Sequence, residues 1–264
     1  MIIVFSGTGN SIFVARGLSA ALGDEIVSLP VKDAQSLCPA DGRVIWVFPV
    51  YSWGIPPVLA DVIHDIEIVS GAGLQHFAVM TCGDDTGYTD RIWRRAMAAR
   101  GWRGLDAWSV QMPNTYVFMK GFDVDTVEVA QGKVDAAAKR IESIASAINT
   151  RRPTDRVRSD VVRGWFPWTK TYVIRPWFVR REMSPRPFHC TDDCIGCRIC
   201  AEHCPMHNIK MDSGRPAWGD DCAFCLRCYH ICPRHAVAWG KASRGKGQSR
   251  ILINLTYKTD DLVK

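Results

Sequence analysis

Short apolar runs alternate with helix-like stretches along the first 150 residues. A run such as Arg43-Val-Ile-Trp-Val-Phe-Pro-Val50 is almost continuously apolar, which is typical of a parallel strand buried on both faces. The expected strands are residues 2–5, 24–29, 43–50, 75–82 and 105–112. The expected helices are residues 12–22, 58–66, 90–99 and 126–149. Strands alternating with helices in this way predict an α/β fold with a doubly wound, five-stranded parallel sheet.

A loop rich in glycine and hydroxyl side chains follows the first apolar run directly. Its residues are Ser6, Gly7, Thr8, Gly9, Asn10 and Ser11. A strand, such a loop and a helix N-terminus together bind phosphate, because free N–H groups and the helix dipole point at the anion. The loop is neither a Walker A motif nor G-x-G-x-x-G. A plain turn is the alternative, and the position directly after an N-terminal strand favours phosphate binding.

Two copies of the spacing C-x₂-C-x₂-C-x₃-C-P, 28 residues apart, dominate the C-terminal part. This is the spacing of bacterial ferredoxins, in which the fourth cysteine of each run ligates the other cluster. The sequence therefore predicts two [4Fe–4S] clusters with crossed ligands. The first cluster would be held by Cys194, Cys197, Cys200 and Cys232. The second would be held by Cys222, Cys225, Cys228 and Cys204.

Zinc is the alternative for these cysteines, because zinc knuckles also pair C-x₂-C motifs with nearby histidines. Two runs of four cysteines exceed what zinc needs, so iron–sulfur clusters are expected. The internal repeat predicts a small α+β domain with two short hairpins and two short helices. Cys190 is not expected to be a ligand, and Cys38 has no predicted role.

Residues 151–189 form an expected connector between a first domain, residues 1–150, and the cluster domain, residues 190–240. Aromatic and basic side chains are interleaved in its second half. They would either fill the seam between the domains or contact a membrane surface, and we expect the seam. Four prolines argue against one long amphipathic helix here: Pro167, Pro176, Pro185 and Pro187.

The net charge of +6 is concentrated around the cluster domain. The connector carries ten basic and three acidic side chains, and the tail, residues 241–264, carries six and two. Basic flanks offset the negative charge of thiolate-held clusters and favour acidic partners. No nucleic-acid motif accompanies the charge, so no nucleic-acid partner is expected. The tail is expected to be mobile up to Ser249, with a strand-like stretch at residues 251–257.

The chain has no run of 18 apolar residues and no signal-peptide pattern at its start. We therefore expect a cytoplasmic location, where clustered cysteines bind metal more often than they form disulfides.

The order of these parts resembles the flavodoxin–ferredoxin fusion family, or iron–sulfur flavoproteins of the fused-ferredoxin type. The first loop resembles the phosphate loop of flavodoxins, and Tyr51-x-x-Gly-x-Pro-Pro57 and the two cysteine runs follow in that family's order. The resemblance covers about residues 1–240. It implies an electron-transfer protein that carries FMN and two [4Fe–4S] clusters.

In the flavodoxin family the first loop holds the FMN phosphate and two later loops embrace the ring. By resemblance, Tyr51 or Trp53 would stack on the flavin. The opposite wall would be formed by Cys82, Gly83, Asp84 and Tyr88. The same two loops would contribute Pro49, Ser52, Gly54 and Thr81. For Trp53 and Tyr88 the alternative is packing at a loop edge, and for Cys82 a small buried hydrophobe.

The expected function is electron relay between the clusters and FMN, with conversion between one- and two-electron steps for a protein redox partner. The alternative is a flavoenzyme that reduces a small substrate at the flavin and is fed by its own clusters. A third class is a redox sensor or a membrane-surface adaptor that uses the connector. Electron relay needs no catalytic acid or base, and the sequence makes no prediction of oligomeric state.

Overall fold

The computed structural model describes residues 1–30, 37–40, 42–69, 73–152, 154–249 and 251. Its larger part is a parallel sheet of the order β2-β1-β3-β4-β5-β6. The strands are β1 (Ile2–Val4), β2 (Ile26–Ser28), β3 (Arg43–Pro49), β4 (Gln75–Cys82), β5 (Gly104–Gln111) and β6 (Ser159–Asp160). The first five are the predicted strands, and their order is that of flavodoxin-like folds.

The sixth strand corrects the expected count of five. Ser159 and Asp160 pair in parallel with Ala107 and Trp108 of β5. Both residues of β6 are polar and exposed, so the apolar pattern carried no signal for them. They belong to the expected connector, which therefore extends the edge of the sheet.

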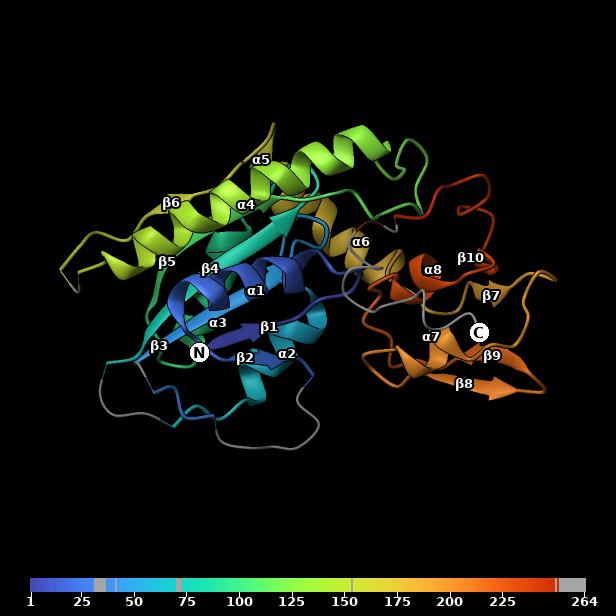
Figure 1. Cartoon of the computed structure of the whole chain (residues 1–264), viewed down its shortest axis with the longest axis horizontal. Helices are drawn as coiled ribbons and strands as arrows, with labels where there is room; N and C mark the ends of the chain where they lie inside the picture. The colour runs from blue at the N-terminus through green and yellow to red at the C-terminus, as the bar shows by residue number, and fades with distance from the viewer. Residues whose placement is uncertain (31–36, 41, 70–72, 153, 250, 252–264) are drawn as a thin grey trace.

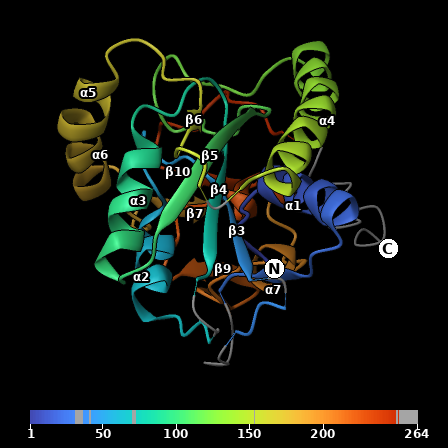
Figure 2. The ribbon, with the colours of Figure 1, turned by 90° about the vertical axis from the view of Figure 1, so that its left-hand side faces the viewer.

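Helices cover both faces of the sheet, as Figure 2 shows. Side chains of successive strand residues point to opposite faces, so Ile2 and Val4 join one apolar core and Ile3 the other. The first core is covered by α1 (Asn10–Leu22) and α4 (Val127–Asn149), and the second by α2 (Pro57–Asp65) and α3 (Thr89–Ala99). The fold is thus a three-layer α/β arrangement whose loops of interest all lie at the carboxyl ends of strands.

A smaller α+β unit lies beyond those carboxyl ends (Figure 1). Its elements are β7 (Phe188–Cys190), α7 (Ile199–Glu202), β8 (Ile209–Asp212), β9 (Arg215–Trp218), α8 (Arg227–Ile231) and β10 (Val237–Trp239). β8 and β9 form a hairpin, whereas β7 pairs antiparallel with β10 from the opposite end of the unit. The expectation of two hairpins was wrong in this respect, because the second pair joins the two ends of the repeat.

The connector contains a continuous helical segment, which corrects the expectation drawn from its prolines. It consists of α5 (Pro167–Thr169), η1 (Lys170–Ile174) and α6 (Arg175–Arg181). Pro167 stands at the start of the helix, where a missing N–H costs no hydrogen bond. Just before Pro176 the helix widens into a π segment, in which the Arg175 N–H bonds the Lys170 carbonyl five residues back.

The aromatic side chains of the connector do not fill the seam between the domains as expected. Trp165, Phe166, Trp168 and Trp177 are all exposed. Only Phe178 of this helical segment is a buried aromatic. Figure 2 shows α5 and α6 on the outer side of α3, away from the sheet.

Within the described ranges, no helix combines the length and the apolar character needed to cross a membrane.

Residues 246–249 of the tail, in the stretch expected to be mobile, are hydrogen-bonded to other parts of the chain. Lys246 donates from Nζ to the Phe122 carbonyl at 2.6 Å, and the Gly247 N–H donates to Asp123 Oδ1 at 2.9 Å. The Ser249 N–H donates to Nδ1 of His230 at 3.0 Å. The tail thereby contacts both the first domain and α8. The strand-like stretch predicted at residues 251–257 lies, apart from Ile251, outside the described residues.

Candidate functional site

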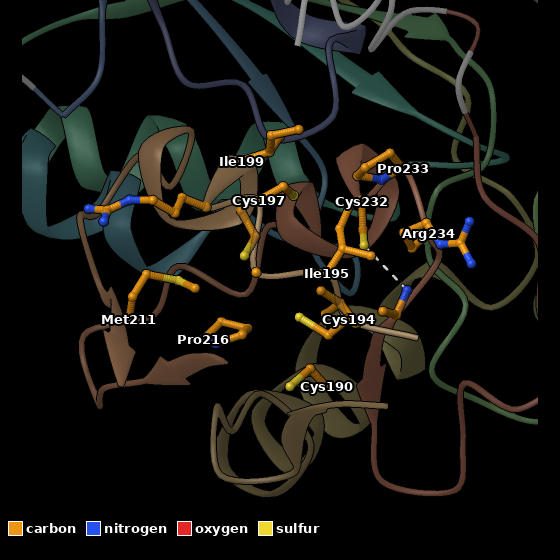
Figure 3. A pocket seen from close by; sticks show the side chains of 15 residues that line it. Cys190, Cys194, Ile195, Cys197, Ile199, Met211, Pro216, Cys232, Pro233 and Arg234 are labelled. Atoms are coloured by element: carbon orange, nitrogen blue, oxygen red, sulfur yellow. Dashed lines mark hydrogen bonds between the residues drawn. The ribbon is translucent and has the colours of Figure 1, made fainter. Parts of the chain in front are cut away.

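Four cysteine side chains surround one pocket in the smaller unit. Cys194, Cys197, Cys200 and Cys232 line it together with apolar groups such as Ile195 (Figure 3). Burial, followed by the neighbouring sulfurs of Cys232, Cys197 and Cys194, raises the pKa of Cys200 to about 12. The fourth cysteine of the second run therefore lies with the first three of the first run.

The other four cysteines form a second group. Burial raises the pKa of Cys222, and together with the smaller effects of Cys225 and Cys204 it brings this pKa to about 12. Burial also raises the pKa of Cys228, and Cys225 and Cys222 act in the same direction. Within the described residues, no three His, Cys, Asp or Glu side chains converge closely enough to hold one single metal ion.

Backbone N–H groups point at the cysteine sulfurs. Asn208 donates to Cys204 and Phe224 to Cys222, each at 3.4 Å. In the first group, Ala236 donates to Cys232 at 3.3 Å, the bond drawn in Figure 3. Soft sulfur donors, apolar walls and N–H groups directed at sulfur fit an iron–sulfur cluster, whose charge such bonds stabilise.

Cys190 also lines the first pocket, although it was not expected to be a ligand. The Arg215 Nε–H donates to its sulfur at 3.3 Å. Cys38, the other cysteine without a predicted role, is exposed.

The glycine loop occupies the carboxyl end of β1, where α1 begins. Gly9 has a φ of 104°, in the left-handed region that favours glycine, and it precedes the first helical residue. Ser6, Thr8 and Ser11 are buried there. Gly9 has no side chain to cap the helix, so the N-terminus of α1 keeps backbone N–H groups for an anion.

Several side chains of this loop already bond to the protein. The Ser6 Oγ accepts from the Ile12 N–H at 3.3 Å, and Asn10 Nδ2 donates to the Pro113 carbonyl at 2.9 Å. The hydroxyl oxygens of Ser11 and Thr81 are 2.8 Å apart. These bonds tie the loop to the ends of β4 and β5, which shapes it before any ligand binds.

The loop after β3 is a tight turn from Tyr51 to Gly54. The two residues exchange backbone hydrogen bonds of 2.9 and 3.1 Å. Between them, Ser52 and Trp53 both have positive φ, a conformation unusual for such side chains. The Ser52 Oγ is buried without a hydrogen-bond partner among the described residues. Pro49 pairs with Thr81 at the end of the sheet, directly below this turn.

The loop after β4 forms the opposite side of the same edge. The Asp84 carbonyl accepts from Gln111 Nε2 at 2.9 Å. The side chain of Asn114 packs directly over Gly83, which leaves no space for a Cβ. The Tyr88 ring is covered by the guanidinium of Arg91, 3.9 Å from the ring centre. Both predicted flavin loops therefore lie near the glycine loop, as carboxyl-end loops of neighbouring strands.

Cys82 is directed into the sheet. Its sulfur is 4.0 Å from the Val110 carbonyl oxygen of the neighbouring strand. Burial, followed by the charges of Asp85 and Asp84, raises the pKa of this thiol to about 12. These surroundings resemble those of a small buried hydrophobe, the alternative that the sequence left open.

Connector side chains fasten both flavin loops, a role that the sequence did not predict. Arg175 donates to the Tyr51 carbonyl at 2.9 Å and to the Ile55 carbonyl at 2.6 Å. Thr171 donates from Oγ1 to the Trp53 carbonyl at 3.2 Å and accepts from the Tyr88 N–H at 2.9 Å. Gly54 has no room for a Cβ because Arg175 lies against it.

The second cysteine group lies against the glycine loop. A Cβ on Gly7 would stand only 2.6 Å from the Cys225 carbonyl oxygen. Arg227 donates to the carbonyls of Gly7 and Ser6 at 2.7 and 2.5 Å and to the His203 carbonyl at 2.9 Å. Tyr51 and Cys225 both pack on the same apolar core. Cysteine spacing says nothing about the residues between the cysteines, so Arg227 was not identifiable from the sequence.

Comparison with known proteins gives the following similarities. Residues 193–237 match the family model described as a 4Fe-4S dicluster domain. Among solved structures, an NAD(P)H:quinone oxidoreductase from Methanothermobacter marburgensis is 10% identical, with a TM-score of 0.35 over 57% of this chain and 97% of that one. No curated protein matches the chain.

Two further solved structures have similar values. An FMN-dependent NADH-azoreductase from Bacillus anthracis, in complex with FMN, is 13% identical, with a TM-score of 0.36 over 56% of this chain and 98% of that one. A flavodoxin from Streptococcus pneumonia TIGR4 is 16% identical, with a TM-score of 0.32 over 54% of this chain and 97% of that one. The strand order and the match of the cysteine-rich segment together define the class: a redox protein with a flavodoxin-like domain and an iron–sulfur domain.

Proposed function

We propose that the protein relays electrons between two [4Fe–4S] clusters and an FMN on behalf of a redox partner protein. One observation carries this proposal: the second cysteine group packs directly on the glycine loop through Gly7 and Arg227. Cofactors bound at these two places would be neighbours, which electron transfer requires. Clusters accept one electron at a time and flavin accepts one or two, so together they convert between the two kinds of step.

Each cluster would be held by one cysteine group. The first group would bind one cluster through Cys194, Cys197, Cys200 and Cys232. The second group would bind the other through Cys222, Cys225, Cys228 and Cys204. The N–H groups that donate to Cys204, Cys222 and Cys232 would stabilise negative charge on the sulfurs.

FMN would fit the three loops at the carboxyl end of the sheet. The N-terminus of α1 and the Thr8 hydroxyl would bind its phosphate. The buried, unpartnered Ser52 Oγ is a hydrogen-bonding group that a ligand would satisfy. Tyr51 would lie between the ring and the second cysteine group: it packs on the same apolar core as Cys225, and burial, followed by the charges of Cys225 and Cys222, raises the pKa of Tyr51.

The chain's own residues hold this junction rigid. Arg227 ties the cluster loop to the glycine loop, and Arg175 and Thr171 tie the two flavin loops to the connector helix. No side chain needs to transfer a proton for electron relay. The role of the protein would be to fix the distance between the cofactors and to keep water away from the junction.

The proposal is tested by anaerobic reconstitution of the full chain, with iron, sulfide and flavin measured together. Roughly eight irons and one FMN per chain are expected. Stepwise reduction should then show cluster and flavin signals in the same molecule. Zinc in place of iron would end the proposal, and eight irons without flavin would remove its FMN part alone.

A cytoplasmic location and a protein redox partner belong to the same proposal. The alternative, reduction of a small substrate at the flavin, makes a different prediction. In that case the reduced, purified protein would be reoxidised by a small substrate with no partner protein present. Reoxidation that requires a second protein supports the relay.

A further inference from the structure

The outer side of the connector helix carries an unusual concentration of exposed apolar side chains. We name this surface the aromatic face. Its members are Trp165, Phe166, Trp168, Tyr172, Val173 and Trp177. The exposed fractions of Trp165, Trp168 and Trp177 are 83%, 59% and 52%. The rings of Trp168 and Tyr172 lie 6.0 Å apart, and Val173 and Trp177 are exposed further along the same segment.

This face cannot turn inward, because the opposite side of the helix is fastened to the first domain. Thr171 is only 2% exposed and bonds to both flavin loops. Arg175 donates to two carbonyls of the turn after β3, and Lys170 donates to Asp85 Oδ2 at 2.6 Å. The aromatic face is therefore held outward by polar contacts on the other side of the same helix.

The backbone conformation and exposure of Phe166 also support a binding role for the aromatic face. Its φ is 51°, a conformation that costs energy for a bulky side chain. Its ring is 74% exposed, so packing within the chain does not offset that cost. Exposed apolar patches of this kind mark sites that contact a protein or a membrane.

The charge of the helix indicates which kind of partner binds the aromatic face. No Asp or Glu occurs from Trp165 to Arg181. Arg180 and Arg181 are exposed at the end of the helix, one turn beyond Trp177. A second copy of the same face would present the same unbalanced positive charge, which disfavours the pairing of two such faces.

We propose that the aromatic face docks on an anionic phospholipid surface. Tryptophan and tyrosine rings concentrate at the boundary between lipid headgroups and acyl chains, and arginines attract the anionic headgroups. The aromatic rings would enter that boundary, while Arg180 and Arg181 would remain among the headgroups. The inference does not rest on the proposed electron relay, because it uses only the exposed side of the helix.

The test is co-sedimentation of the holoprotein with vesicles of defined composition. Vesicles of equal parts phosphatidylcholine and phosphatidylglycerol should carry the protein down at low salt, and vesicles of phosphatidylcholine alone should not. Quenching of tryptophan fluorescence by lipids labelled in the acyl chain should accompany sedimentation. Added salt should release the protein, because it screens the arginines.

Substitutions separate the two contributions. The double variant Trp168→Ser and Trp177→Ser should bind at least about tenfold more weakly, because two large apolar side chains are lost. The double variant Arg180→Gln and Arg181→Gln should bind roughly twenty-fivefold more weakly, at about fivefold for each arginine. The matched control is Val127→Ser, which removes an exposed apolar side chain, 72% exposed, from α4; its binding should be unchanged.

These variants alter exposed side chains, so iron content and circular dichroism should match the original protein. Absence of sedimentation with anionic vesicles at low salt would overturn the proposal. So would binding that the tryptophan variant leaves intact. A concentration-dependent dimer, detected by light scattering and abolished in the tryptophan variant, would assign the face to a second copy instead.

Discussion

The Nε–H of Arg227 donates to the Gly7 carbonyl oxygen at 2.7 Å, although 220 residues separate the two along the chain. This bond joins the smaller α+β unit to the glycine loop of the flavodoxin-like sheet. A second bond from the same guanidinium reaches the Ser6 carbonyl. The arginine therefore clamps the two units at the place where two different cofactors would meet.

Replacing this arginine should loosen the junction. Arg227→Met keeps most of the side-chain length and removes the charged hydrogen bonds, which should lower the free energy of unfolding by about 2 kcal/mol. Reduction of the flavin after rapid photoreduction of the clusters should also become slower. Arg198→Met is the control, since Arg198 is exposed and its side chain pairs with the exposed Glu202 of the same run, at 3.7 Å. If the two variants had the same free energy of unfolding and the same rate of flavin reduction, Arg227 would not be what holds the two units together.

Gly7 should tolerate no side chain. The Cβ of Gly7→Ala would lie 2.6 Å from a backbone oxygen of Cys225, and backbone cannot move aside as a flexible side chain can. We expect a loss of about 1–3 kcal/mol in the free energy of unfolding, measured by urea denaturation. Gly132→Ala is the matched control: it lies in α4 with nothing within 4 Å, and it should be neutral or stabilising by up to about 1 kcal/mol. A Gly7→Ala variant as stable as the control would contradict the close packing.

Arg175 should influence flavin binding without contacting the clusters. Its bonds to the Tyr51 and Ile55 carbonyls hold the turn in which Ser52 and Trp53 have positive φ. Arg175→Met should release this turn and weaken FMN binding about tenfold, equivalent to about 1.4 kcal/mol. Flavin titration measures this, and iron content should stay constant. Arg181→Met, on the exposed end of the same helix, should leave FMN affinity unchanged.

The crossed cysteine groups can be separated by single substitutions. Cys204→Ser changes the first run but should disturb the second cluster, so about four of eight irons should remain. The electron paramagnetic resonance spectrum of the remaining cluster should match that of Cys225→Ser. A spectrum like that of Cys197→Ser would mean that each run binds its own cluster.

His76 should make stability depend on pH. Its ring is fully buried, and Nδ1 accepts from the Trp46 Nε1–H at 3.2 Å. Burial lowers the pKa of His76 from 6.5 to about 4. Between these values the unfolded chain binds the proton and the folded chain does not, so stability is full above about pH 6.5 and is lost as the pH falls towards 4.

The difference can be measured by urea denaturation at two pH values. From pH 7 to pH 5 the original protein should lose about 2 kcal/mol more than His76→Gln, which keeps an acceptor for Trp46 but does not titrate. Equal losses of unfolding free energy in the two proteins would show that protonation of His76 does not destabilise the folded chain.

The sequence predicted those parts of the fold in which apolar side chains repeat. Buried strands such as β3 are almost wholly apolar, so their existence and order along the chain were predictable. β6 was not, because Ser159 and Asp160 form a strand only by pairing with β5. The effect of Pro176 on the connector helix was mispredicted for a related reason. That effect depends on the π segment before the proline, which no local pattern shows.

The candidate site divides in the same way. Cysteine spacing predicted two groups, because three of the four members of each lie close together in the sequence. Arg227, Arg175 and Thr171 act through partners at least 83 residues away, apart from the Arg227 contact with His203. Contacts over such separations depend on how the units dock, so a single sequence contained no signal for them.

The two cysteine runs share the spacing of their cysteines and the final proline, yet their surroundings differ. At the position of Arg227 the first run has Ile199, and Cys197 of that run is exposed whereas Cys225 is covered by the glycine loop. A duplicated segment alone would offer two interchangeable ends. In the proposed relay, this one guanidinium would decide which cysteine group is enclosed beside the flavin site, and the exposed group at the other end would be the one through which a partner protein exchanges electrons.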